Sequence, residues 1–178
     1  MLEVYERLGM QCDDPIDLRV ILSHEQRDRG RMRIFSTGGE EVRLFLKRGS
    51  PLLVGEVLRS VCGRHILVEG AIEPVVTASC EDWESFSKAC YHLGNRHVKV
   101  QIGNCWLRIL PDHVLEDMLA QLDLTLAHGS HVFIPESGAY GQSGHHHQHA
   151  LTPVDGADAG SFDTSTLERV TRHFPEHH

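Results

Sequence analysis

The order of hydrophobic patterns between residues 75 and 126 is the feature that most constrains how this 178-residue chain can fold. Short runs of β-branched and aliphatic residues at 75–78 and 124–126 predict a first and a last strand. Between them, segments 98–102 and 105–110 flank a turn and predict a hairpin. Apolar residues at helical spacing occupy the two remaining stretches. The resulting order β-α-β-β-α-β is typical of the ferredoxin-like unit.

Each of the two predicted helices carries one apolar stripe that should face the sheet. The first helix begins at Ser79 or Cys80, and its predicted stripe is Trp83, Phe86, Ala89, Cys90 and Leu93. We expect Gly94 to end this helix as a left-handed C-terminal cap. The second helix begins at Pro111-Asp112, and its predicted stripe is Val114, Leu115, Met118, Leu119 and Leu122.

The residues on either side of this unit have different compositions. The first 70 residues predict a small β-domain that curls on itself, with strand-like segments at 2–5, 18–22, 32–35, 42–46, 53–58 and 65–69. After Tyr140 the chain is rich in Gly, Ser, His, Asp and Thr, a composition that cannot offset the entropy of ordering. We therefore predict an α+β protein with an N-terminal all-β domain (1–72), a ferredoxin-like domain (73–141) and a disordered histidine-containing tail (142–178).

Composition excludes several classes of protein. No apolar run approaches the ~20 residues of a membrane helix, and no signal peptide is visible, so we expect a cytoplasmic protein without a membrane partner. A net charge of −8 argues against a nucleic-acid partner. The five cysteines form no C-x-x-C pair, so we expect reduced, mostly buried thiols rather than disulfides or a Cys-rich zinc site.

Metal binding is the chemistry that the 14 histidines favour, because neutral imidazole is the commonest metal ligand in proteins. His97 directly follows the predicted first helix and, by two-residue period, lies on the solvent face of the next strand. There it is a candidate ligand, or alternatively a surface residue that caps the helix. His92 in the last turn of the first helix and His113 in the first turn of the second are auxiliary candidates with the same structural alternative.

The tail contains the densest group of imidazoles in the chain, His145, His146, His147 and His149. Four imidazoles within five residues bind transition metals, in an exchangeable way if the segment is disordered. Imidazole suits Cu(II) and Zn(II) as well as Ni(II), and Cu(II) outranks Ni(II) in intrinsic affinity. Cu(II) or Zn(II) would therefore compete with nickel for this cluster. His24, His65, His128 and His131 are isolated and are interpreted as ordinary residues.

Motifs of enzymes are absent from the sequence. H-E-x-x-H, G-x-S-x-G, the P-loop and the dinucleotide fingerprint do not occur. Cys90 paired with His92 or His97 is the one conceivable nucleophile and base, but Cys90 falls on the predicted buried stripe. We therefore predict a protein that is not an enzyme. It would be a metal carrier or, alternatively, a metal buffer whose ligands all lie in the tail.

Three segments carry a resemblance to a known family: Lys-Ala-Cys-Tyr-His-Leu-Gly-Asn-Arg-His-Val at 88–98, Asp-His-Val-Leu at 112–115 and Pro-Glu-Ser-Gly-Ala-Tyr-Gly at 135–141. Together with the tail from His145, they resemble the UreE family of urease accessory proteins, which are nickel metallochaperones. The resemblance implies a β-domain that binds peptide or partner protein, followed by a ferredoxin-like metal-binding domain.

The resemblance also implies a homodimer in which His97 of both subunits meets at the interface and binds Ni(II) as cargo. His92, His113 and the tail histidines fall where relatives have further ligands. The implied partners are a urease accessory GTPase and apo-urease. This sequence departs from some relatives at Pro111, which replaces a histidine before Asp112, and its tail is less rich in histidine than the densest examples.

Overall fold

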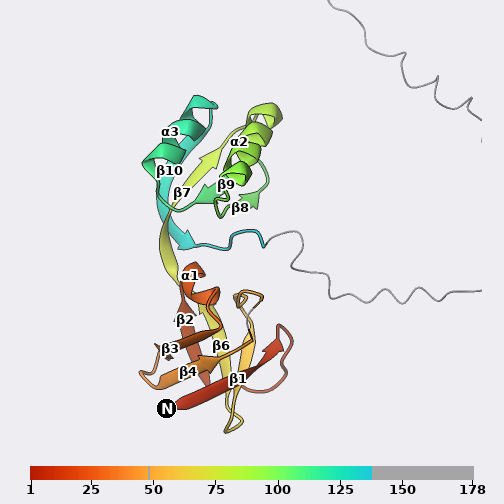
Figure 1. Cartoon of the computed structure of the whole chain (residues 1–178), viewed down its shortest axis with the longest axis vertical. Coiled ribbons are helices and arrows are strands. Elements are labelled where there is room, and N and C mark those ends of the chain that lie inside the picture. Colours follow the sequence, from red (N-terminus) through yellow and green to blue (C-terminus); the bar gives the residue numbers. More distant parts are fainter. Residues whose placement is uncertain (48, 138–178) are drawn as a thin grey trace, which may run out of the picture. The chain divides into compact units, whose positions relative to one another are not determined.

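The computed structural model describes residues 1–47 and 49–137, which form two β-sheets, each with its own buried cluster (Figure 1). The predicted disorder of the tail concerns residues outside this range. In the part of the chain described, no helix has the length and apolar character needed to cross a membrane. The elements in chain order are β1 (Leu2–Gly9), β2 (Leu18–Leu22), α1 (His24–Arg27), β3 (Arg31–Phe35), β4 (Glu41–Phe45), β5 (Val57–Ser60), β6 (His65–Gly70), β7 (Ile72–Ser79), α2 (Trp83–Asn95), β8 (Gln101–Gly103), β9 (Trp106–Ile109), α3 (His113–Gln121) and β10 (Thr125–Val132).

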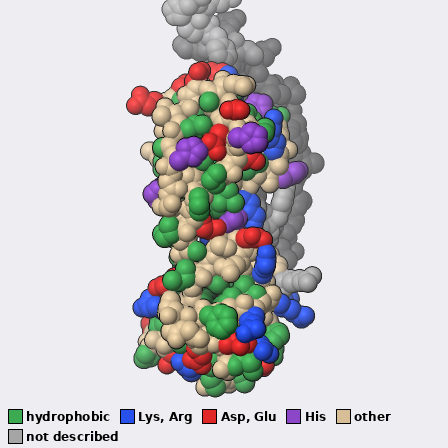
Figure 2. All heavy atoms as spheres, turned by 90° about the vertical axis from the view of Figure 1, so that its left-hand side faces the viewer, with side chains coloured by type: hydrophobic (Ala, Val, Ile, Leu, Met, Phe, Trp, Pro, Cys, Tyr) green, Lys and Arg blue, Asp and Glu red, His purple; other side chains and the backbone are tan. Residues whose placement is uncertain are grey.

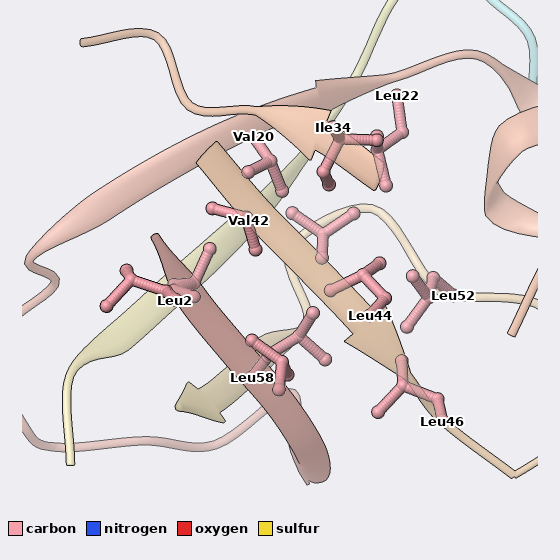
Figure 3. Close-up of a cluster of buried hydrophobic side chains, with 12 residues drawn as sticks. Leu2, Val20, Leu22, Ile34, Val42, Leu44, Leu46, Leu52 and Leu58 are labelled. Atoms are coloured by element: carbon pink, nitrogen blue, oxygen red, sulfur yellow. The ribbon is translucent and has the colours of Figure 1, made fainter. Parts of the chain in front are cut away.

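The first sheet has the strand order β2-β6-β5-β1-β4-β3, with β1 parallel to β4 and β2 parallel to β6. Alternate residues of these strands point into one core, as Figure 3 shows for Val20 and Leu22 of β2 and for Val42 and Leu44 of β4. Such alternation follows from the two-residue period of a strand. The predicted β-structure of the first 70 residues is confirmed, with the short helix α1 as an addition.

The fifth strand starts later than predicted, at Val57 rather than residue 53. Gly55 is left-handed, with a φ of +91°, and the Leu53 N–H donates to Oε2 of Glu56 over 2.9 Å. These features make residues 53–56 a turn, because a left-handed residue interrupts an extended strand.

The second sheet has the strand order β10-β7-β9-β8, and all its neighbouring strands are antiparallel. Helices α2 and α3 pack on one face of it, since their buried residues share a cluster with alternate residues of β7 and β9. The members of this cluster are Val76, Ala78, Phe86, Ala89, Leu93, Leu107, Ile109, Leu119 and Leu124. The predicted mixed α+β class is therefore confirmed.

Both long helices begin after an aspartate. The Asp82 carboxylate accepts the Ser85 N–H over 2.8 Å, so α2 begins at Trp83. The predicted start at Ser79 or Cys80 is wrong, because β7 continues to Ser79, which pairs with both neighbouring strands. Asp112 likewise caps α3, accepting the N–H groups of residues 114 and 115 over 2.9 and 3.1 Å.

Three predicted core positions are exposed. Trp83 (67% exposed) and Val114 (60%) stand in the first turn of their helices, and burial in α2 begins at Phe86. Ile102 (43%), at the end of the predicted strand 98–102, lies opposite the buried Leu107, but β8 is the edge strand of the sheet, so its side chain is only partly covered. The β8–β9 turn is Asn104-Cys105, one residue later than predicted, with Cys105 left-handed at φ +57°.

Candidate metal centre

Helix α2 ends in a Schellman turn, and His97 is its left-handed residue. The His97 φ is +54°, its N–H donates to the Gly94 carbonyl over 3.0 Å, and the Val98 N–H donates to the Leu93 carbonyl over 3.2 Å. Gly94 remains inside the helix, so the prediction of a left-handed cap at Gly94 is wrong. The turn comes later because Leu93 and Val98, the apolar pair that accompanies such a turn, both pack against the second core.

His97 therefore lies in a turn rather than on a strand, and the predicted strand-face position is wrong, since β8 begins only at Gln101. A left-handed conformation costs a residue with a Cβ atom about 1 kcal/mol, although histidine adopts it more readily than β-branched residues do. The side chain is exposed. An accessible imidazole is thus attached to a backbone that hydrogen bonds hold on both sides.

Helix α3 ends in the same way at Asp123. Its φ is +62°, its N–H donates to the Ala120 carbonyl over 3.1 Å, and the Leu124 N–H donates to the Leu119 carbonyl over 3.1 Å. A non-glycine residue at this position is thus a common feature of both helix ends. The strained backbone alone does not mark His97 as functional; its imidazole and exposure do.

The other predicted ligands do not gather around His97 within one chain. His92 is half-buried in the last turn of α2, with its ring edge-on to Tyr91 and its carbonyl accepting from Nη1 of Arg96 over 3.0 Å. His113 is the exposed first residue of α3. Among residues 1–47 and 49–137, no group of three metal-binding side chains includes either of them or His97. The remaining predicted ligands lie outside the described residues: His145, His146, His147 and His149.

Several histidine side chains lie on the surface formed by the second sheet and its helices (Figure 2). One of the histidines interpreted as ordinary, His128 on β10, lies with Nε2 3.0 Å from Oε2 of Glu116. The other oxygen of Glu116 accepts the Asp112 N–H over 3.1 Å, so this carboxylate links the start of α3 to β10. His128 is therefore already engaged by a partner within its own chain.

His65, interpreted from sequence as isolated, begins β6 of the first sheet and lies beside Cys12 and Asp14 of the loop between β1 and β2. More than fifty residues separate His65 from these two in the chain, and no local spacing signals their proximity. Sequence reasoning missed this group because the pairing of β6 with its neighbours creates it.

The cysteines differ from the prediction of mostly buried thiols: Cys62 is exposed, and the other four are half-buried. Burial raises the pKa of the Cys90 thiol. This disfavours the thiolate that a nucleophile requires, and therefore the pairing of Cys90 with His92 or His97. Hydrogen bonding to the Ser60 hydroxyl, 3.3 Å from Sγ, lowers the pKa of the Cys62 thiol.

We expect Cys62 to react with iodoacetamide faster than Cys90 at neutral pH, because a lower pKa leaves more thiolate and the side chain is exposed. Peptide mass spectrometry after short labelling times measures both rates in one sample. Ser60→Ala should slow the labelling of Cys62 and leave that of Cys90 unchanged. Equal rates at the two cysteines would contradict the expectation.

The fold and the site place this chain in the class of small two-sheet α+β proteins, with the exposed imidazole of His97 as a candidate metal ligand. Residues 4–71 match the N-terminal domain of the UreE urease accessory protein, and residues 73–159 match its C-terminal domain. The chain therefore belongs to the UreE family of urease accessory proteins, as the sequence motifs predicted.

Individual relatives agree with this assignment. The urease accessory protein UreE of Marinomonas sp. (strain MWYL1) is 63% identical over 147 residues, which cover 83% of this chain and all of that protein. The proteins of the same name from Alteromonas mediterranea and Azotobacter vinelandii are 48% and 47% identical, covering 83% and 75% of this chain and 95% and 80% of their own. The family is one of accessory proteins, so the prediction of a protein that is not an enzyme is confirmed.

Proposed function

We propose that this protein is a nickel metallochaperone, which binds Ni(II) through His97 and delivers it to the urease maturation complex. The observation that carries the proposal is the exposed imidazole of His97, held on the hydrogen-bonded turn that ends α2. Membership of the UreE family supports urease as the enzyme served. The partners are then the urease accessory GTPase and apo-urease, and the site of action is the cytoplasm.

A homodimer follows from the number of ligands that nickel needs. One imidazole leaves most coordination positions unfilled, whereas a two-fold axis through the site brings His97 of a second copy to the same ion. His92, His113 and the histidines at 145–147 and 149 are proposed as auxiliary ligands, with water in the remaining positions. Because few ligands are preorganised, exchange should be fast, which suits delivery. Cu(II) and Zn(II) should compete with Ni(II) at such imidazole sites.

The proposal assigns a separate role to each of three segments of the chain. Residues 1–72 are assigned to partner binding, 73–141 to a ferredoxin-like metal-binding domain, and 142–178 to a tail that supplies extra ligands. The strand order β10-β7-β9-β8 supports the ferredoxin-like topology. In the chain, α2 follows β7 and α3 follows β9, as that topology requires. The two family matches meet between residues 71 and 73, which supports the boundary.

Truncation of the tail separates delivery from buffering. A chain ending at Gly144 loses the imidazoles of the cluster but keeps His97, so it should bind fewer nickel ions and still activate urease. Equilibrium dialysis with metal analysis measures the nickel bound. A reconstituted assay with apo-urease and its accessory proteins measures activation.

The comparison variant is His97→Ala in the full-length chain. It should keep the nickel ions of the tail and lose activation. The opposite pattern, with activation lost on truncation and normal in His97→Ala, would show a tail-based metal buffer and overturn the proposal.

A further inference from the structure

We propose that Cys12, Asp14 and His65 form a second metal site, suited to Zn(II), on the first sheet. Their ligand atoms, a thiol sulfur, a carboxylate oxygen and an imidazole nitrogen, all lie within 4.8 Å of one another. Nε2 of His65 is 3.6 Å from Oδ2 of Asp14. This group contains none of the residues proposed to handle nickel.

The spacing is close to that of a tetrahedral zinc site. With zinc–ligand bonds of about 2.0–2.3 Å, neighbouring ligand atoms in a tetrahedron lie about 3.3–3.8 Å apart. The distance between His65 and Asp14 already falls in this range. Cys12 is half-buried in an irregular loop, and rotation about its single side-chain torsion can bring the sulfur nearer. Metal binding therefore requires only a small local adjustment.

Two hydrogen bonds hold the loop beside His65, and neither uses the metal-binding side chain of Cys12, Asp14 or His65. The Asp17 N–H donates to the His65 carbonyl over 3.0 Å, and the His65 N–H donates to Oδ2 of Asp17 over 2.7 Å. His65 is the first residue of β6, and its backbone pairs with Arg59 of β5. The imidazole, with 14% of the side chain exposed, thus has a defined position, and the other two ligands come from the loop.

The donor set selects the kind of metal. A thiolate, an imidazole and a carboxylate together suit borderline-soft Zn(II), whereas Mg(II) and Ca(II) prefer oxygen ligands alone. Asp13 and Asp17 add negative charge in the same loop, which favours a cation beside the thiolate. Three protein ligands leave one tetrahedral position for water. An ion pair of His65 with Asp14 alone is the competing explanation, and it assigns no role to the Cys12 sulfur.

Cobalt(II) provides a test on the full-length protein, because its bond to a thiolate absorbs in the near ultraviolet and its bonds to imidazoles do not. Titration of the reduced protein should produce this charge-transfer band, and Zn(II) should remove it by displacement. Cys12→Ser should abolish the band. Asp14→Asn, a change at a side chain that is 67% exposed, should weaken Co(II) binding about tenfold or more.

Cys62→Ser is the matched control, since Cys62 is the exposed cysteine outside the group, and it should leave the band unchanged. His97→Ala should also leave it unchanged, so failure of the nickel proposal and failure of this one are distinguishable. Circular dichroism checks that each variant is folded. The proposal is overturned if the wild-type protein shows no thiolate band with excess Co(II), or if the band survives Cys12→Ser.

Discussion

Replacing His97 with glycine is expected to make the protein more stable and, at the same time, to remove the proposed shared nickel site. Glycine adopts the left-handed conformation at φ +54° without the clash of a Cβ atom. The free energy of unfolding should therefore rise by about 1 kcal/mol. The imidazole is lost, so nickel binding outside the tail and activation of urease should be lost with it.

Urea denaturation measures the stability, and nickel dialysis measures the site in the same samples. Asp123→Gly is the matched control, because Asp123 occupies the same position in an identical turn at the end of α3. It should raise stability by a similar amount and leave nickel binding unchanged. His97→Ala keeps a Cβ atom and should lose nickel without the gain in stability. Normal nickel binding in His97→Gly would contradict the proposed role of this residue.

Glu56→Gln is expected to lower the free energy of unfolding by about 2 kcal/mol, because it breaks a part-buried ion pair and leaves the Arg7 guanidinium without its carboxylate partner. Only 3% of the Glu56 side chain is exposed, and its two oxygens accept from Nε and Nη2 of Arg7 over 2.5 and 2.8 Å. One of them also accepts the Leu53 N–H over 2.9 Å. The pair thus joins β1 to the turn before β5.

The control is Glu6→Gln, which breaks a similar two-bond contact with Arg59 on the surface. Both side chains of that pair are about half exposed, so the loss should stay below about 1 kcal/mol. Denaturant midpoints compare the two variants directly. Equal losses in both would show that the burial of Glu56 does not set the strength of its pair.

Together, the substitutions at His97 and Glu56 separate two parts of the molecule. Stability of the first sheet depends on Glu56, whereas the proposed nickel chemistry depends on a residue whose backbone is strained. A change at Glu56 should act on urease activation only through the amount of folded protein. His97→Gly should abolish activation even though the protein is more stable.

Helix positions show where sequence reasoning succeeded. Phe86, Ala89 and Leu93 were predicted to face the core from their spacing, and all three are buried. The 3.6-residue period places such residues on one side of a helix whatever it packs against. The prediction failed at Trp83 and Val114, because spacing does not reveal that the first turn of a helix extends beyond its contact with the sheet.

At the candidate site, too, one feature could be predicted from the sequence and another could not. His97 stood out from the sequence because its motif resembles that of the UreE family of urease accessory proteins. Its conformation could not be predicted, because the point where α2 ends depends on how Leu93 and Val98 pack against the sheet. The proximity of Cys12 to His65 was likewise hidden, since it arises from strands that pair across a long stretch of chain.

By itself, the sequence determined the order of the strands and of the two long helices, the start of α3 at Asp112 and the family, because these depend on spacing and motifs along the chain. The tertiary structure alone decided that His97 is left-handed and that a cysteine, an aspartate and a histidine meet on the first sheet. Both results depend on contacts between segments far apart in the chain, and local spacing carries no information about such contacts.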